Sequence, residues 1–192
     1  MPVPFIVGAM TIRPHGGSEM ELVDLYNEER IPLGKSVERY AQRRRKDSGE
    51  YRVVVHICIF NSAGEMLLQQ RSMKKDAFPG MWDVSAAGGI RAGENSRQGA
   101  EREVREELGY PLDLTGVRPS VTVNYDGGFD DFFLVVRDDL KVEELTLQTE
   151  EVAAVRWAGL DEILLMLERG EFVPYPASFL RFVFDMHDTF GF

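Results

Sequence analysis

The sequence predicts an α/β protein of the mixed α+β kind, built as an α/β/α sandwich around a mixed central β-sheet. Strand-like apolar runs fill the first half of the chain, and a helical pattern occupies residues 96–108. Further strand patterns follow, and two amphipathic helical patterns come last. This order favours one mixed sheet covered by helices on its faces. The 192 residues fit a single domain with an N-terminal extension.

Residues 1–50 are expected to form this extension, with a β-hairpin packed on a main domain of residues 51–192. Residues 22–26 alternate like a strand, and residues 31–34, with a Pro and a Gly, are expected to supply the turn. The basic run at 43–46 is interpreted as a solvated loop or helix end rather than a patch for an anionic ligand. The N-terminal apolar piece has no basic stretch before it, which favours a leader or early strand over a signal peptide.

The central strands are predicted from apolar runs and turn residues. The run YRVVVHICIF at 51–60 is typical of a buried strand, and residues 66–70 should return as the second arm of a hairpin. A short strand is expected at 82–87. Strands are also expected at 117–124 and 132–136, around a Gly-Gly turn, and at 152–157.

Two helices are expected at the C-terminal end, at 161–169 and 177–187. The second is strongly apolar, so it should either cover the sheet or form a contact in a homodimer. The same two options hold for the N-terminal hairpin.

Composition excludes several classes of protein. Hydrophobic residues make up 44% of the chain, but none of the apolar runs reaches the roughly 18 residues that a membrane span needs. A formal charge of -10 argues against a nucleic-acid partner, which a basic surface would bind. The single cysteine, Cys58, cannot form an internal disulfide or a Cys-rich zinc site, and a reducing cytoplasm is its simplest setting.

The informative stretch is GGIRAGENSRQGAEREVREELGY, residues 88–110. Asn95 or Ser96 can cap the start of its helix, and Gly109 can end the helix in a left-handed conformation. An apolar stripe at i, i+4 and i+8 should face the core; it consists of Ala100, Val104 and Leu108.

A second face of this helix is acidic, because Glu103, Glu106 and Glu107 fall at i, i+3 and i+4. Like charges at this spacing repel one another, and Arg102 and Arg105 can offset only part of that repulsion. A divalent cation would offset it better, and oxygen-only ligands suit Mg²⁺ or Mn²⁺ rather than Zn²⁺. A solvated acidic face is the alternative for the helix taken alone.

The wider spacing decides between these readings of the helix. The pattern G-x5-E-x7-R-E-U-x-E-E-x-G-U, with U a bulky apolar residue, is the signature of the Nudix hydrolases. This chain matches it at every position: Gly88, Glu94, Arg102, Glu103, Val104, Glu106, Glu107, Gly109 and Tyr110. The sequence therefore resembles the Nudix family. The resemblance implies metal-dependent hydrolysis of a phosphoanhydride bond in a nucleoside-diphosphate-linked or other diphosphate-containing small molecule.

The resemblance also implies roles for individual residues. Metal ligands would be the carboxylates of Glu103, Glu106 and Glu107, with Glu94 in support and the carbonyl of Ala87 as a further ligand. Arg102 would orient Glu103 by a charge-assisted hydrogen bond. Gly88 and Gly89 would let the backbone approach the ion and the substrate closely. The base that activates water stays open between Glu103 and a distant carboxylate, Glu150 or Glu151.

Other residues on the substrate side have two interpretations each. Arg71 is expected either to contact a substrate phosphate or to form a surface ion pair. Phe78 or Trp82 could stack on a base, although packing under the loop is the commoner use of such aromatics. His56 and Cys58 lie two apart on a strand and are interpreted as core or sheet-face residues without a catalytic role.

Two other functions compete with hydrolysis. Residues 60–61, 67–71 and 78–82 also resemble the isopentenyl-diphosphate isomerases, which share the Nudix fold. Those enzymes carry a catalytic cysteine and a metal-binding histidine after the tryptophan, and here residues 83–88 contain neither. The resemblance therefore favours an isomerase-like subgroup of Nudix hydrolases. A catalytically silent nucleotide sensor is the other alternative, but sensors often lose signature carboxylates and this chain keeps them all.

Overall fold

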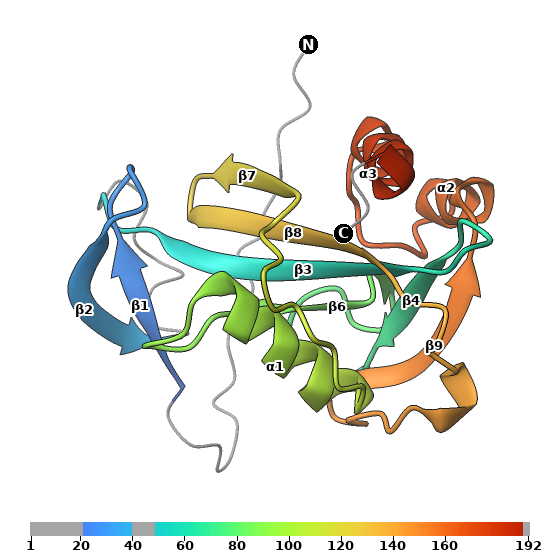
Figure 1. Ribbon diagram of the computed structural model, residues 1–192, viewed down its shortest axis with the longest axis horizontal. Coiled ribbons are helices and arrows are strands. Elements are labelled where there is room, and N and C mark those ends of the chain that lie inside the picture. The colour runs from blue at the N-terminus through green and yellow to red at the C-terminus, as the bar shows by residue number, and fades with distance from the viewer. Residues whose placement is uncertain (1–20, 40–48, 190–192) are drawn as a thin grey trace.

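A computed structural model describes residues 21–39 and 49–189 (Figure 1). The N-terminal segment 1–20 and the basic run at 43–46 lie outside the described residues. The elements in chain order are β1 (Leu22–Tyr26), β2 (Pro32–Glu38), β3 (Arg52–Phe60), β4 (Met66–Arg71), β5 (Trp82–Asp83), β6 (Ala86–Gly89), α1 (Ser96–Leu108), β7 (Val121–Tyr125), β8 (Gly128–Val136), the 3-10 helix η2 (Val142–Glu144), β9 (Val152–Ala158), α2 (Leu160–Glu168) and α3 (Ala177–Thr189).

The main sheet is mixed, as predicted. Its strands run in the order β5-β4-β3-β8-β7, while β6 pairs with β3 and β9 pairs with β4. β3 and β8 are parallel along their whole length, from Arg52 opposite Gly128 to Phe60 opposite Val136. The other pairings in this sheet are antiparallel. β3 therefore lies in the middle of the sheet, which explains why its sequence is apolar on both faces.

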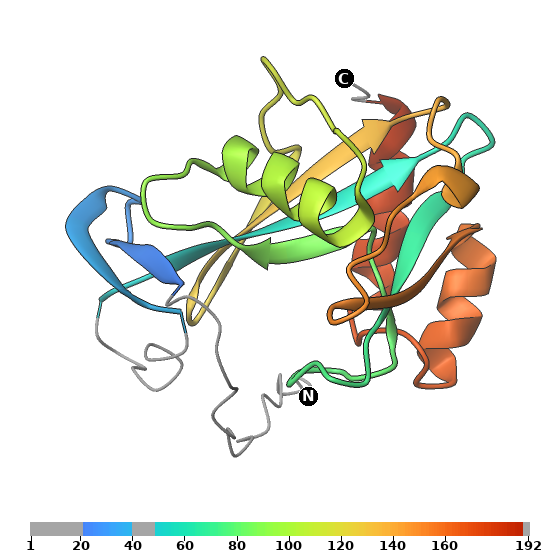
Figure 2. The same ribbon diagram turned by 90° about the horizontal axis from the view of Figure 1, so that it is seen from below.

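Helices cover both faces of this sheet, so the predicted sandwich is confirmed. α1 lies across β3 and β6 on one face, whereas α2 and α3 lie on the other (Figures 1 and 2). The pleat of β3 divides the core: Val55 and Ile57 pack toward α1, and Cys58 and Phe60 pack toward α2 and α3. Among the described residues, no helix is long and apolar enough to cross a membrane.

The N-terminal hairpin of β1 and β2 forms a small sheet of its own, and its turn was predicted in the wrong place. The chain turns at Asn27, whose Oδ1 accepts hydrogen bonds from the backbone amides of Glu29 and Ile31 at 3.1 and 2.8 Å. Arg30 takes the left-handed conformation, with φ of 63°. The predicted turn at 31–34 instead belongs to β2, since Pro32 opens that strand.

Other boundaries also differ from the sequence prediction: β7 begins at Val121 rather than at 117, and β8 begins at Gly128 rather than at 132. The single strand expected at 82–87 is two short strands, β5 and β6, because Ser85 leaves the ladder. Its hydroxyl donates to the Leu67 carbonyl and accepts from the Ile59 amide. The expected hairpin of β3 and β4 pairs only at Phe60 and Met66, because β4 diverges to pair with β9.

Candidate active site on the carboxylate helix

α1 forms where the sequence predicts it and is fixed at both ends. Asn95 caps its start: Asn95 Oδ1 accepts from the Gln98 amide, and Gln98 Oε1 accepts from the Asn95 amide, both at 3.0 Å. Gly109 ends the helix with φ of 69°. The predicted apolar stripe of Ala100, Val104 and Leu108 is fully buried against the sheet. This packing turns the acidic face of α1 toward the loop that follows β6.

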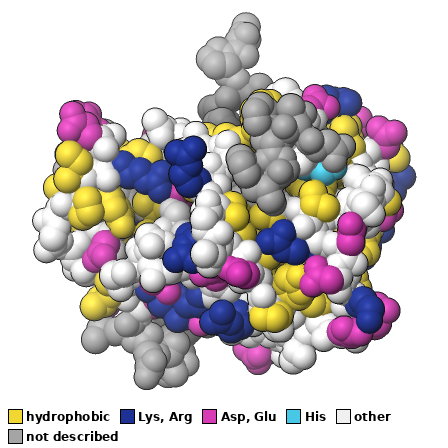
Figure 3. Space-filling model, viewed as in Figure 1, with side chains coloured by type: hydrophobic (Ala, Val, Ile, Leu, Met, Phe, Trp, Pro, Cys, Tyr) yellow, Lys and Arg dark blue, Asp and Glu magenta, His cyan; other side chains and the backbone are white. Residues whose placement is uncertain are grey.

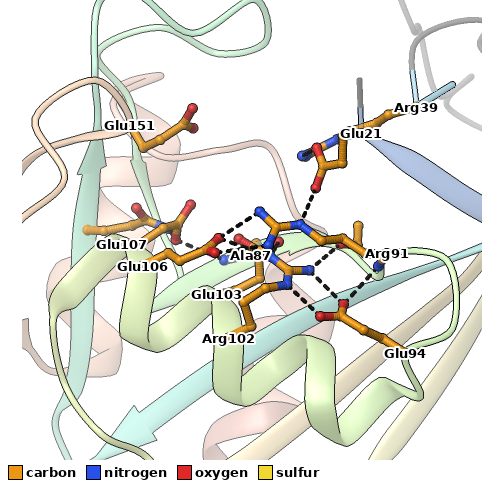
Figure 4. Close-up of polar contacts among 12 residues, drawn as sticks. Glu21, Arg39, Ala87, Arg91, Glu94, Arg102, Glu103, Glu106, Glu107 and Glu151 are labelled. Carbon is orange, nitrogen blue, oxygen red and sulfur yellow. Dashed lines mark hydrogen bonds and ion pairs between the residues drawn. The ribbon is translucent and has the colours of Figure 1, made fainter. Parts of the chain in front are cut away.

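Arg102 is the centre of a polar network on that face (Figure 4). Its guanidinium donates to both oxygens of Glu94 at 2.8 and 2.9 Å, to Glu103 at 2.8 Å and to Glu106 at 3.1 Å. It also donates to the carbonyl of Gly89 at 2.9 Å. Burial opposes the charge of Arg102, but its hydrogen bonds to Glu94 and Glu103 raise its pKa above the ordinary value. Arg102 thus makes the hydrogen bond to Glu103 on which its predicted orienting role depends.

Glu103 and Glu107 are buried carboxylates, 7% and 4% exposed. Burial raises the pKa of Glu103. Burial, followed by the nearby charge of Glu103, raises the pKa of Glu107 to about 8. Glu107 accepts hydrogen bonds from the Gln69 amide group at 3.0 Å and from the Ala87 backbone amide at 3.3 Å. Glu103 and Glu107 are therefore neighbouring buried carboxylates, and ionising both of them is costly without a cation.

The backbone of β6 touches these carboxylates directly. A Cβ atom on Gly88 would lie 2.1 Å from Glu103 Oε1, so only glycine allows the carboxylate to rest against the strand. The amide of Ala87 donates to Glu107, and the carbonyl of Gly89 accepts from Arg102. Ala87, Gly88 and Gly89, the three backbone positions predicted for the site, therefore all contact the carboxylate network.

Glu106 is the most exposed of the three helix carboxylates, at 38% of its side chain. Arg91 donates two hydrogen bonds to it, one to each carboxylate oxygen, at 3.1 and 3.2 Å. Arg91 Nε donates to Glu21, the residue before β1, at 3.2 Å. Sequence reasoning missed both Arg91 and Glu21, because Arg91 occupies an unspecified position of the signature and Glu21 lies far from it in the chain.

A cavity of about 140 Å³ opens between the carboxylate helix, the residues that flank the N-terminal hairpin and three loops. It is lined by charged residues of both signs together with Ala87 and Gln148; the charged ones are Glu21, Arg39, Lys75, Arg91, Arg102, Glu103, Glu106, Glu107 and Glu151. Acidic and basic side chains also lie beside one another across the face of the molecule in Figure 3. The cavity can therefore hold an anion and its counter-cation together.

The two distant carboxylates that could act as base occupy different places. Glu151 lines the cavity and forms an ion pair with Lys75. Glu150 does not line the cavity; it pairs at 3.3 Å with Lys74, and both side chains are exposed to solvent.

Arg71 is mostly buried and pairs away from the carboxylate cavity. It donates to the carbonyl of Ala77 at 2.9 Å and to Asp83 at 3.1 Å, and it does not line the cavity. Trp82 lies beneath the guanidinium of Arg156, 4.9 Å from its ring centroid, whereas Phe78 is exposed.

His56 and Cys58 lie on the sheet face opposite α1. The His56 ring stacks on Phe132 at 4.5 Å, and its Nδ1 lies 3.3 Å from the Tyr175 hydroxyl. Cys58 is fully buried, and burial raises the pKa of its thiol well above the ordinary value. A buried neutral thiol fits the core role predicted for it.

The donor set fits a hard divalent cation. Its members offer oxygen only, Glu103 and Glu107 are buried side by side, and Gly88 leaves room against the backbone. In the described part of the chain, no three His, Cys, Asp or Glu side chains are yet gathered around one point. Arg91 and Arg102 pair with Glu106, and Arg102 also pairs with Glu94.

Comparison with known proteins agrees with this geometry. The model of the NUDIX domain matches residues 50–180. An uncharacterised Nudix hydrolase of Listeria innocua is 42% identical over 170 residues, which cover 88% of this chain and 97% of that protein. An isopentenyl-diphosphate isomerase of Citrobacter koseri is 30% identical over 127 residues, covering 64% of this chain and 70% of the isomerase. A crystal structure of a Deinococcus radiodurans protein superposes with a TM-score of 0.63 at 21% identity and covers 85% of this chain and 99% of that one.

A helix-covered mixed sheet with a glycine strand against a carboxylate helix defines the class of Nudix-fold proteins. The chain belongs to the Nudix family, and it is a pyrophosphohydrolase.

Proposed function

We propose that the protein uses Mg²⁺, with Mn²⁺ as a substitute, to hydrolyse a phosphoanhydride bond in a nucleoside-diphosphate-linked or other diphosphate-containing small molecule. The observation that supports this most strongly is the buried pair of Glu103 and Glu107, held against the glycine backbone of β6. A bound cation would stabilise such a pair, whereas without a cation the buried charges lower the stability of the folded protein.

In this proposal Glu103, Glu106 and Glu107 hold the ion, with Glu94 and the carbonyl of Ala87 in support. The ion would neutralise phosphate charge and acidify a water molecule. Arg102 would orient Glu103 through its 2.8 Å hydrogen bond, and its charge opposes the rise that burial causes in the pKa of Glu103.

The proton of the attacking water goes to a carboxylate of this chain. Glu103 and Glu151 both line the cavity, and the position of Glu151 favours it over Glu150 as the distant alternative. Gly88 and Gly89 are proposed to let the substrate approach the backbone closely. Arg71 stays a prediction as a phosphate contact, and it would have to leave Asp83 to make that contact.

A hydrolysis screen with Mg²⁺ at slightly alkaline pH tests the proposal. The compounds are nucleoside triphosphates, ADP-ribose, dinucleotides, sugar nucleotides, coenzyme A and isopentenyl diphosphate. Turnover that requires metal and falls by orders of magnitude in Glu106→Gln supports the proposal. Folded protein that binds one of these compounds without turning any over would leave the sensor function instead.

The observation that favours the isomerase alternative is the similarity to the Citrobacter koseri isomerase. Isomerisation of isopentenyl diphosphate, followed by NMR in the same screen, would favour it. The absence of cysteine and histidine from residues 83–88 predicts that none occurs.

The proposal places the enzyme in the cytoplasm, acting on a small molecule without nucleic acid or membrane. The single cysteine of the chain is consistent with a reducing compartment. A homodimer is proposed to use α3, where Phe182 is 45% exposed. Light scattering of wild type and Phe182→Ser tests it, because the variant should shift the mass toward the monomer.

A further inference from the structure

Arg91 lies in the loop between β6 and α1, beside the metal-binding carboxylates proposed above. Its two terminal nitrogens donate to the two oxygens of Glu106, at 3.1 and 3.2 Å. Its Nε donates to Glu21 at 3.2 Å (Figure 4). Arg91 therefore bridges the carboxylate helix and the start of the N-terminal hairpin.

The hairpin holds this loop by its backbone as well as by side chains. The amide of Ala92 donates to the carbonyl of Leu22 at 2.8 Å, and the amide of Gly93 donates to Asp24 at 2.7 Å. The guanidinium of Arg91 is thus kept at the cavity, although 44% of its side chain is exposed.

The contacts of Glu106 oppose cation binding at the same carboxylate. Both oxygens face the flat fork of Arg91, and one of them also accepts from Arg102 at 3.1 Å. A carboxylate that binds a metal ion must direct a lone pair of at least one oxygen at the ion. A guanidinium that donates to both oxygens occupies lone pairs that the ion would use, and its positive charge repels the ion.

We propose that Arg91 and the divalent cation compete for Glu106, and that the displaced Arg91, still tethered by Glu21, contacts the diphosphate of the substrate. This inference rests on the proposed function. A guanidinium suits the second role because its fork matches two phosphate oxygens at once. Metal loading would then deliver a phosphate-binding group to the cavity in the same step.

The first consequence is unusual for a residue at a metal site. Replacing Arg91 by Gln should make the metal bind more tightly, by roughly threefold to tenfold, because a partly exposed competing ion pair is lost. Arg91→Lys keeps the charge without the fork and should fall between this variant and the wild type. At saturating Mg²⁺, Arg91→Gln should raise KM by roughly tenfold while kcat changes less than about threefold.

Isothermal titration of the full chain with Mn²⁺ measures the metal affinity without substrate. Arg97→Gln is the matched control: it removes the same charge from α1, where Arg97 pairs with Glu101 at 3.3 Å, outside the cavity lining. An Arg91→Gln variant that binds Mn²⁺ no more tightly than Arg97→Gln would overturn the competition. An unchanged KM would overturn the substrate contact.

The same titration separates this inference from the function it rests on. If the wild type binds Mn²⁺ but hydrolyses none of the screened compounds, the proposed hydrolysis is wrong. The Mn²⁺ affinities of the variants would still decide whether Arg91 and the ion compete for Glu106. Wild type that binds no Mn²⁺ overturns both.

Discussion

Replacing Glu107 by Gln should change how the stability of the metal-free protein depends on pH. The Glu107 side chain is buried in α1, and burial, with the charge of Glu103 second, raises its pKa from 4.5 to about 8. The folded chain therefore holds this proton more tightly than the unfolded chain does. Wild type gains stability from the protonated group below about pH 4.5, and it loses that stability as the pH rises through about 8.

The size of the effect follows from the two pKa values. Each unit between them corresponds to about 1.4 kcal/mol, so ionised Glu107 lowers the free energy of unfolding by roughly 4 to 5 kcal/mol at pH 9. Gln is uncharged at every pH, and its side-chain oxygen can still accept from Gln69 or from the Ala87 amide. Glu107→Gln should therefore match wild type near pH 5 and exceed it by several kcal/mol at pH 9.

Urea unfolding in EDTA at pH 5, 7 and 9 measures this difference. Glu144→Gln, an exposed carboxylate in η2 paired with Lys141, serves as the control and should shift stability equally at each pH. If the difference between wild type and Glu107→Gln stays constant with pH, or favours wild type at pH 9, the burial argument is wrong.

Three further predictions concern single positions in or beside the site. Gly88→Ala should push the Glu103 carboxylate away, since the new Cβ would lie 2.1 Å from it, and steady-state kinetics should show kcat lowered by roughly a hundredfold; a loss below tenfold contradicts this. Glu151→Gln should lower kcat by roughly a hundredfold, as measured by a pH–rate profile, and Glu150→Gln should lower kcat less. A larger loss in Glu150→Gln than in Glu151→Gln would assign the base to Glu150. Arg30→Met should remove the cation that pairs with the fully buried Asp131 and lower the free energy of unfolding by roughly 3 to 5 kcal/mol in urea. The hydroxyls of Ser96 and Thr122 also donate to Asp131, so a change under 1 kcal/mol would show that they satisfy that carboxylate alone.

The carboxylate helix could be predicted closely because its signals are local. The cap at Asn95, the stop at Gly109 and the apolar stripe all act within a few turns of the same helix. The long apolar run of β3 was equally clear, since a strand in the middle of a sheet is buried on both faces.

The rest depends on contacts between distant segments. The turn at Asn27 is set by side-chain hydrogen bonds that compete with a Pro-Gly pattern a few residues later. Arg91 has no local pattern at all, and its importance appears only when the hairpin brings Glu21 beside it. The separate positions of Glu150 and Glu151 likewise depend on which side of the loop faces the cavity.

The most direct test of the account is a Mg²⁺ titration of hydrolysis with the best substrate, in wild type, Glu106→Gln and Glu101→Gln. Glu101 lies on the same helix but turns away from the cavity, where it accepts from the Leu114 amide at 2.9 Å. We expect wild type and Glu101→Gln to be inactive in EDTA and to recover fully with Mg²⁺, and Glu106→Gln to stay slower by orders of magnitude. Turnover that persists in EDTA, or equal rates in the two variants, would contradict a mechanism built on these carboxylates.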